Sequence, residues 1–96
     1  MFEKLKQIKD YRDQAKKIQS ALKDEKVEGS GGWGKVKVSM DGNQEVQDVV
    51  IAPELLTASR GPELQKAVKD AVNEAIKSAQ KKMASRVKDM GGLPQL

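Results

Sequence analysis

Two long helical patterns enclose a short block of strand patterns, and this arrangement limits the chain to an α+β fold. Near the N-terminus apolar residues recur at alternating intervals of three and four without Gly or Pro, which predicts a helix over about residues 2–24. A second apolar stripe begins after Pro62 and stops at Gly91, which predicts a helix over about residues 62–90. The strands are expected over about residues 26–51, so the predicted order is α-β-β-β-α.

The middle block predicts a three-stranded antiparallel sheet. Apolar and polar residues alternate strictly over Lys35–Met40, which is typical of a strand with one buried face. Asp41-Gly42 predicts the following hairpin turn, because this pair supports positive φ angles. Alternation in the last strand places Val49 and Ile51 on one face and Val46 and Val50 on the other. Both faces of that strand therefore need cover, which a second copy of the chain could supply.

The apolar content is low for a monomer. Val, Ile, Leu and Phe make up 21 of the 96 residues, and small domains bury a low fraction of their surface. The length corresponds to a single domain over residues 1–96. Alanines flank the apolar stripe of the last helix, and their small side chains favour a close packed interface. The low apolar content, together with a last strand that needs cover on both faces, leads us to expect a homodimer.

Several function classes are excluded by residues that the sequence lacks. With no His and no Cys, the chain has no imidazole base, thiolate nucleophile or Cys/His metal site, and no residue spacing indicates another catalytic or metal site. We expect no enzyme activity, no cofactor and no small-molecule substrate. The longest apolar stretch, residues 49–52, is far too short to span a membrane, and no export signal is visible. These features predict a soluble cytoplasmic protein.

Positive charge is concentrated toward the two ends. The net charge is +4, and residues 75–88 contain five basic residues and no acidic one. A phosphate backbone is bound by Lys or Arg on a surface free of compensating acids. The candidate DNA-binding residues lie on the two predicted helices: Lys9, Lys16, Lys23, Lys77, Lys81 and Lys88.

A glycine-rich stretch matches a nucleotide-binding pattern in its letters only. Residues 29–36 fit G-x-G-x-x-G-x-V, but a strand follows where a dinucleotide-binding fold requires a helix, and a kinase would need a downstream H-R-D catalytic loop, whose His this chain lacks. We interpret the stretch as a hairpin turn. Trp33 at its tip is expected to cover a strand or a partner surface, with stacking on a nucleobase as the alternative.

Several segments together resemble the YbaB/EbfC family of bacterial nucleoid-associated DNA-binding proteins. The resemblance spans nearly the whole chain in the right order. It rests on Gln14-Ala15-Lys16-Lys17-Ile18-Gln19, on residues 27–38, on Asp41-Gly42, on residues 49–56, on residues 64–76 and on residues 83–94.

This resemblance implies a homodimer of α-β-β-β-α subunits shaped like tweezers, located in the nucleoid. Duplex DNA would be engaged by the first and last helices, which agrees with the charge distribution. The alternative is a prefoldin-like module whose helices clasp protein clients without nucleic acid. That alternative predicts exposed apolar residues at the helix tips, namely Phe2, Leu5, Met90 and Leu93.

Overall fold

The computed structural model describes residues 2–89, and for residues 2–8 only the course of the backbone. Its helices and strands are α1 (Phe2–Lys23), β1 (Lys26–Gly31), β2 (Val36–Asp41), β3 (Val46–Ile51) and α2 (Gly61–Asp89). Two short 3-10 turns, Pro53–Leu55 and Ala58–Arg60, connect β3 to α2. All strand pairs are antiparallel, in the order β1-β2-β3. The α+β class and the order of the elements are as the sequence predicts.

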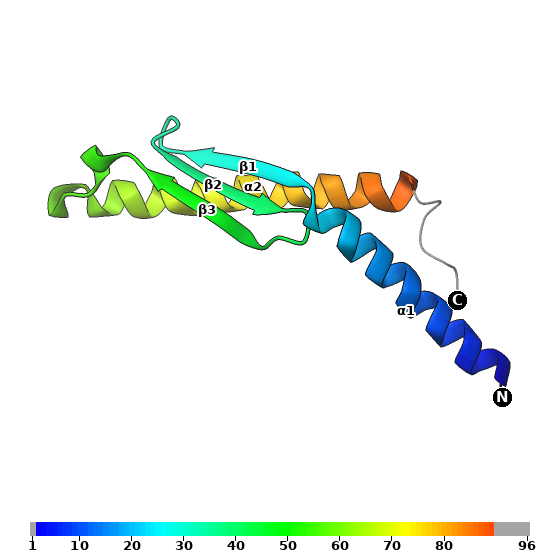
Figure 1. Cartoon of the computed structure of the whole chain (residues 1–96). Helices are drawn as coiled ribbons and strands as arrows, with labels where there is room; N and C mark the ends of the chain where they lie inside the picture. The colour runs from blue at the N-terminus through cyan, green and yellow to red at the C-terminus, as the bar shows by residue number, and fades with distance from the viewer. Residues whose placement is uncertain (1, 90–96) are drawn as a thin grey trace.

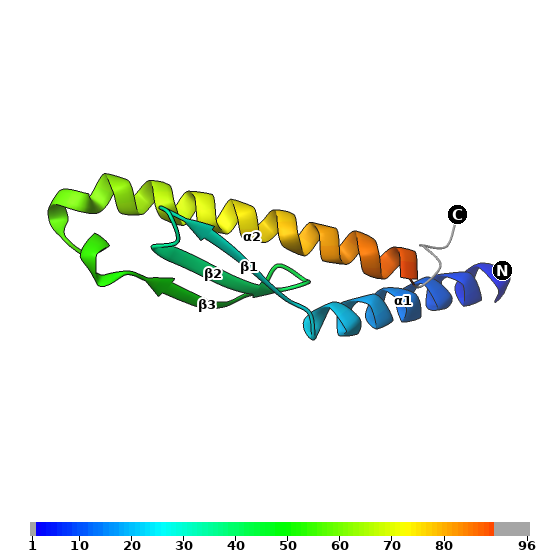
Figure 2. The same cartoon turned by 90° about the horizontal axis from the view of Figure 1, so that it is seen from above.

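The molecule is elongated, with dimensions of 64 × 23 × 19 Å. The sheet lies along the N-terminal part of α2, while α1 leaves one end of the sheet and diverges from it (Figure 1). In the view from above, α1 and the C-terminal part of α2 extend beyond the same end of the sheet (Figure 2). The fold therefore has a packed layer at one end and two projecting helices at the other.

The core forms between α2 and one face of the sheet. Val36, Val38 and Met40 of β2 are almost completely buried there. The facing side of α2 contributes alanines at every fourth position, which lie on one face of a helix: Ala67, Ala71, Ala75 and Ala79. Their small side chains permit the close approach that the sequence predicts.

Strand β1 of the same chain packs closely against the alanine side of α2. A Cβ atom at Gly29 would overlap the backbone of Ala71 and Ala75, and one at Gly31 would overlap the carbonyl group of Ala67. Glycines of β1 therefore lie directly against the helix backbone. The glycine-rich stretch of the sequence thus has a packing role in addition to forming a turn.

The valines of β3 are distributed over the two faces of the strand differently from the prediction, because the strand contains a bulge. Val49 pairs with Val38 as alternation requires, but the register then shifts and Val46 pairs with Met40. Because cross-strand partners share a face, Val46 lies on the side of Val49 and not of Val50. Val46 and Val49 remain about half exposed, at 49% and 47%.

The turn after β2 also differs from its prediction. Gly42 does not adopt a positive φ angle, whereas Gln44 does, at 66°. The turn is held by the buried carboxylate of Asp41, whose Oδ1 accepts hydrogen bonds from the backbone N–H of Asn43 (2.8 Å) and of Glu45 (3.0 Å). The Asp41 side chain therefore shapes this turn.

Candidate nucleic-acid interface

The six predicted DNA-binding lysines are all exposed. Three lie on α1 and three on the C-terminal half of α2: Lys9, Lys16, Lys23, Lys77, Lys81 and Lys88. Within residues 9–89, whose side chains the structure describes, none of the six forms a salt bridge. Their ammonium groups are therefore accessible to an anionic partner.

The lysines of α1 belong to a continuous cationic stripe. Lys9, Lys16 and Lys23 are seven residues apart, so they fall along nearly the same side of the helix. Arg12, three residues after Lys9 and four before Lys16, lies on that side and is also exposed. We call these four residues the α1 stripe. Arg12 is not among the six lysines predicted from the sequence, although its spacing from Lys9 and Lys16 already places it on the same side of the helix.

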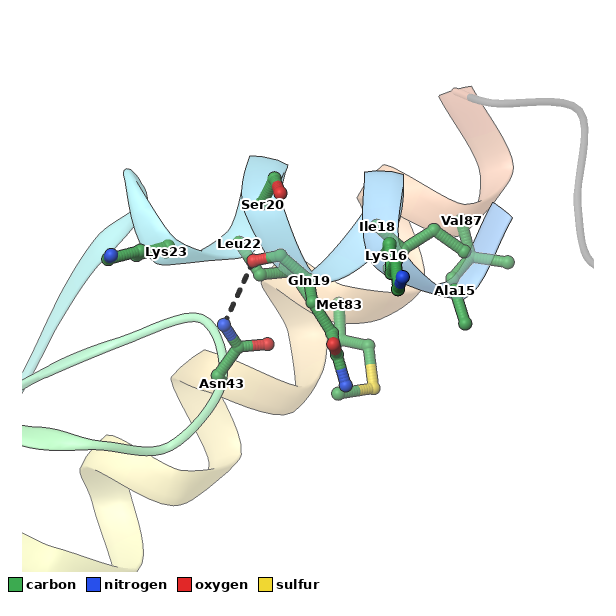
Figure 3. Close-up of a pocket in the computed structure, with 10 residues that line it drawn as sticks. All are labelled: Ala15, Lys16, Ile18, Gln19, Ser20, Leu22, Lys23, Asn43, Met83 and Val87. Carbon is green, nitrogen blue, oxygen red and sulfur yellow. Dashed lines mark hydrogen bonds between the residues drawn. The ribbon is translucent and has the colours of Figure 1, made fainter. Parts of the chain in front are cut away.

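The α1 stripe borders an apolar groove between the two projecting helices. The groove has a volume of about 800 Å³, and Lys16 and Lys23 are among the residues that line it. Apolar side chains of both helices contribute to the lining: Ala15, Ile18, Leu22, Met83 and Val87. Figure 3 shows these residues of α1 and of the C-terminal part of α2 around the groove.

The lysines of α2 form a second, separate stripe. Lys77, Lys81 and Lys88, here called the α2 stripe, lie opposite the buried alanines and so on the side of α2 that faces away from the sheet. On a regular helix they are about 120° around the axis from Met83 and Val87, which line the groove. One chain therefore does not bring the six lysines onto a single surface.

Two other cations of residues 75–88, Lys82 and Arg86, share one acidic partner, which corrects the prediction that this segment is free of compensating acid. Glu25, just after α1, accepts a hydrogen bond from Nε of Arg86 at 2.7 Å, and its other oxygen lies 3.7 Å from Nζ of Lys82. The Nη2 atom of Arg86 also contacts Glu25. The acid comes from about sixty residues earlier in the chain, so a sequence window around α2 does not contain it.

This pairing also changes the protonation of Glu25. The hydrogen bond from Arg86 lowers the pKa of the Glu25 carboxyl below its ordinary value, and the positive charges of Arg86 and Lys82 act in the same direction. Partial desolvation opposes the shift. Glu25 therefore stays ionised to lower pH than a free glutamate, and it joins the end of α1 to α2.

The glycine-rich turn does not have the character of a phosphate site. It connects β1 to β2 and is followed by a strand. The adjoining depression of about 580 Å³ is lined by the carboxylates of Glu63 and Asp70 as well as by Lys66. Trp33 is fully exposed at its tip, with a φ of 59°, so it does not cover the chain's own sheet.

A helix that crosses a membrane must be long and predominantly apolar. Neither α1 nor α2, over residues 2–89, is long and apolar enough to cross a bilayer.

Comparison with known proteins gives one consistent family. The sequence pattern of the YbaB/EbfC DNA-binding family matches residues 1–93. A protein named nucleoid-associated protein in Dictyoglomus thermophilum is 32% identical over 94 residues, which cover 97% of this chain and 90% of the relative. Another of that name in Chloroflexus aurantiacus is 36% identical over 84 residues, with 86% and 84% covered.

A solved structure shares the fold. The crystal structure of an uncharacterized protein from Helicobacter pylori is similar with a TM-score of 0.76 and 24% sequence identity, covering 96% of this chain and 98% of the other. At this identity the likeness concerns the fold alone.

Proposed function

Because this chain belongs to the YbaB/EbfC DNA-binding family, we propose that it is a nucleoid-associated protein that binds duplex DNA through the basic faces of its first and last helices. The family is a DNA-binding family and not an enzyme family. The observation that carries the proposal is the exposure of all six predicted lysines without acidic partners in residues 9–89. Such a protein would reside in the cytoplasm with the nucleoid.

Binding of this kind is mainly electrostatic. Each phosphate that a lysine neutralises releases condensed counterions, so the slope of log affinity against log salt should be roughly −0.9 for every phosphate contacted. A fluorescence anisotropy titration of a generic duplex at several salt concentrations measures this slope. A flat response to salt would exclude the mechanism.

A pair of charge reversals tests the location of the contacts. Lys77→Glu with Lys81→Glu should weaken binding at least about tenfold at moderate salt, because two phosphate contacts become repulsive. The control is Lys66→Glu with Lys69→Glu, which makes the same charge change at exposed positions nearer the start of α2. If both variants lose affinity equally, overall net charge and not the α2 stripe determines binding.

A homodimer is part of the proposal. It is supported by the apolar side of the edge strand β3, where Val46 and Val49 are half exposed beside the core. A second copy of the chain would cover this surface, and its helices would supply the second half of a tweezer-like DNA clamp. The uncovered valines explain how a chain with so few large apolar residues could gain stability by association.

Sedimentation of two variants tests this interface. Val49→Lys places a charge on the side of β3 that shares a face with the core, and it should convert the dimer to a monomer. Val50→Lys makes the same change on the opposite face of the same strand and should leave the dimer intact. Dissociation by Val50→Lys alone would put the interface on the outer face of the sheet.

The protein-clasp alternative depends on apolar residues at the helix tips. The side chains of Phe2 and Leu5, together with Met90 and Leu93, lie outside the described residues. The alternative stays a prediction, and absence of DNA binding by the wild-type protein would favour it.

A further inference from the structure

The end of α1 is joined to the turn between β2 and β3 by specific hydrogen bonds. The backbone N–H of Gly42 donates to the carbonyl oxygen of Leu22 at 2.9 Å, and the side-chain Nδ2 of Asn43 donates to the carbonyl oxygen of Gln19 at 3.0 Å. The Leu22 carbonyl lies in the last turn of α1, where carbonyl groups lack i+4 partners, and it accepts from Gly42 as well as from the N–H of Glu25 at 3.1 Å. The Gln19 carbonyl accepts the Asn43 bond one turn earlier. Figure 3 shows the bond from Asn43 at the sheet end of the groove.

The contact is close as well as directional. A Cβ atom at Gly42 would lie 2.7 Å from Cδ2 of Leu22 and 2.9 Å from its carbonyl oxygen. The Asp41 carboxylate holds the turn in shape through the N–H groups of Asn43 and Glu45. The last turn of α1 therefore lies directly against a turn that the Asp41 carboxylate holds by two hydrogen bonds.

A second attachment connects the same end of α1 to α2. Glu25, two residues after the last residue of α1, pairs with Arg86 and Lys82. Only 19% of the Glu25 side-chain surface is exposed. The two attachments come from different elements, so together they restrain the direction of α1 and not only its position.

Among residues 9–23, the buried apolar side chains of α1 lie near its C-terminal end. Ile18 and Leu22 are buried near its C-terminal end, whereas Arg12 and Ala15 farther along are exposed. Lys9 lies thirteen residues from Leu22, about 20 Å along the helix axis, so a tilt of about 20° at the base would move it by about 7 Å. A charged hydrogen bond to phosphate has a donor–acceptor distance of about 2.8 Å, so such a tilt would break it.

We infer that Asn43 and Glu25 are positioning residues that set the direction of α1, and with it the register of the α1 stripe on DNA. This inference rests on the proposed function for its DNA part only. Neither residue needs to touch DNA, since each acts through the end of α1.

Isosteric variants test the inference without removing packed atoms. Asn43→Asp keeps the shape of the side chain but removes the donor to Gln19, and Glu25→Gln removes the charge that faces Arg86. Matched controls are Asn73→Asp and Glu74→Gln, which make the same changes at exposed positions of α2. Circular dichroism is used to check that all four variants retain the fold.

The first measurement needs no DNA. Because the chain has no cysteine, spin labels at Gln14→Cys in α1 and Gln80→Cys in α2 are specific, and an excess of unlabelled chain restricts the signal to pairs within one chain. We expect the distance distribution between the labels to broaden or shift in Asn43→Asp and Glu25→Gln and to stay unchanged in the controls. An unchanged distribution in both variants would overturn the inference.

The second measurement uses the same variants, unlabelled, with a generic DNA duplex. We expect Asn43→Asp and Glu25→Gln to lose about three- to tenfold in affinity and to reduce the salt slope by about one, as loss of one phosphate contact predicts. A changed label distance with unaltered affinity would refute the effect on DNA register. If the wild-type protein binds no DNA, the proposed function fails. The label distances then still test whether Asn43 and Glu25 set the direction of α1.

Discussion

The two ends of this molecule are held together in different ways. In the sheet layer, the glycines of β1 lie directly against the backbone of α2, so a large surface determines a single arrangement. At the projecting end, the attachments described for residues 9–25 include two buried apolar residues, Ile18 and Leu22, hydrogen bonds from the turn after β2, and the ion pairs of Glu25. The two cationic stripes are therefore supported differently: the α2 stripe continues a helix that packs along the sheet, whereas we infer that the direction of the α1 stripe depends on polar contacts at the end of its helix.

The largest effect is expected where the backbones of β1 and α2 meet. Gly31→Val should lower the free energy of unfolding by at least about 3 kcal/mol, because the new side chain overlaps the carbonyl group of Ala67 and neither backbone can move freely. Urea denaturation measures the loss. Gly61→Ala is the control, since its Cβ would meet nothing within 4 Å, and its stability should change by less than about 0.5 kcal/mol.

At the projecting end, Leu22→Ala should cost about 2–3 kcal/mol, because this almost fully buried side chain is the main apolar anchor of α1. Amide hydrogen exchange should accelerate in α1 while β2 stays protected, which would show that α1 opens separately. Leu56→Ala, at a position 63% exposed, serves as the control. Equal acceleration in α1 and β2 would mean that the two regions unfold as one unit.

A smaller and pH-dependent effect is expected at Glu25. Its folded-state pKa is lowered, so ionised Glu25 stabilises the fold above the pKa of the unfolded chain, about 4.3 for an ordinary glutamate. This stabilisation is lost as the pH falls through the lowered folded-state pKa. Wild type should therefore be more stable than Glu25→Gln at neutral pH, and the difference should disappear in acid.

Thermal unfolding of both proteins across this range measures the difference. Glu74→Gln, at an exposed position, provides the reference for a charge change without a partner among the described residues. A wild-type advantage that persists unchanged in acid would show that the Glu25 contact is not electrostatic.

The smallest effect is expected at Trp33. The side chain is fully exposed in a left-handed backbone conformation, so Trp33→Gly relieves strain and should alter stability by no more than about 1 kcal/mol, in the direction of a gain. Chemical denaturation measures this change. A clear loss of stability would indicate that Trp33 is covered by the second copy of the chain.

Much of the fold could be predicted because its signals are local. The alternation over β2 correctly identifies Val36, Val38 and Met40 as one buried face, and the alanine spacing of α2 correctly indicates close packing. Among the seam residues whose side chains are described, Ile18 and Leu22 at the C-terminal end of α1 are buried, Tyr11 is partly buried and Ala15 is exposed. The periodicity predicts which face of a helix is apolar. It does not determine over what length of the helix another element packs against that face.

The candidate site was less predictable. Helical spacing identifies Lys9, Lys16 and Lys23 as one stripe, but whether a cation has an acidic neighbour depends on elements far apart in the chain. Helical spacing places Arg86 on the side of α2 that carries the buried alanines, away from the free lysines, but it does not reveal that Glu25 is its partner. Asn43 resembles an ordinary turn residue, and its bond to Gln19 spans 24 positions.

By itself the sequence determined the order of the elements, the buried face of β2 and the cationic sides of both helices, because these follow from residue spacing of two and of about 3.6. Only the tertiary structure decided that Gly29 and Gly31 lie against α2, that a bulge moves Val46 onto the face of Val49, and that Glu25 pairs with Lys82 and Arg86. Each of these arises where separate elements meet, and such contacts depend on how whole helices and strands pack together in space.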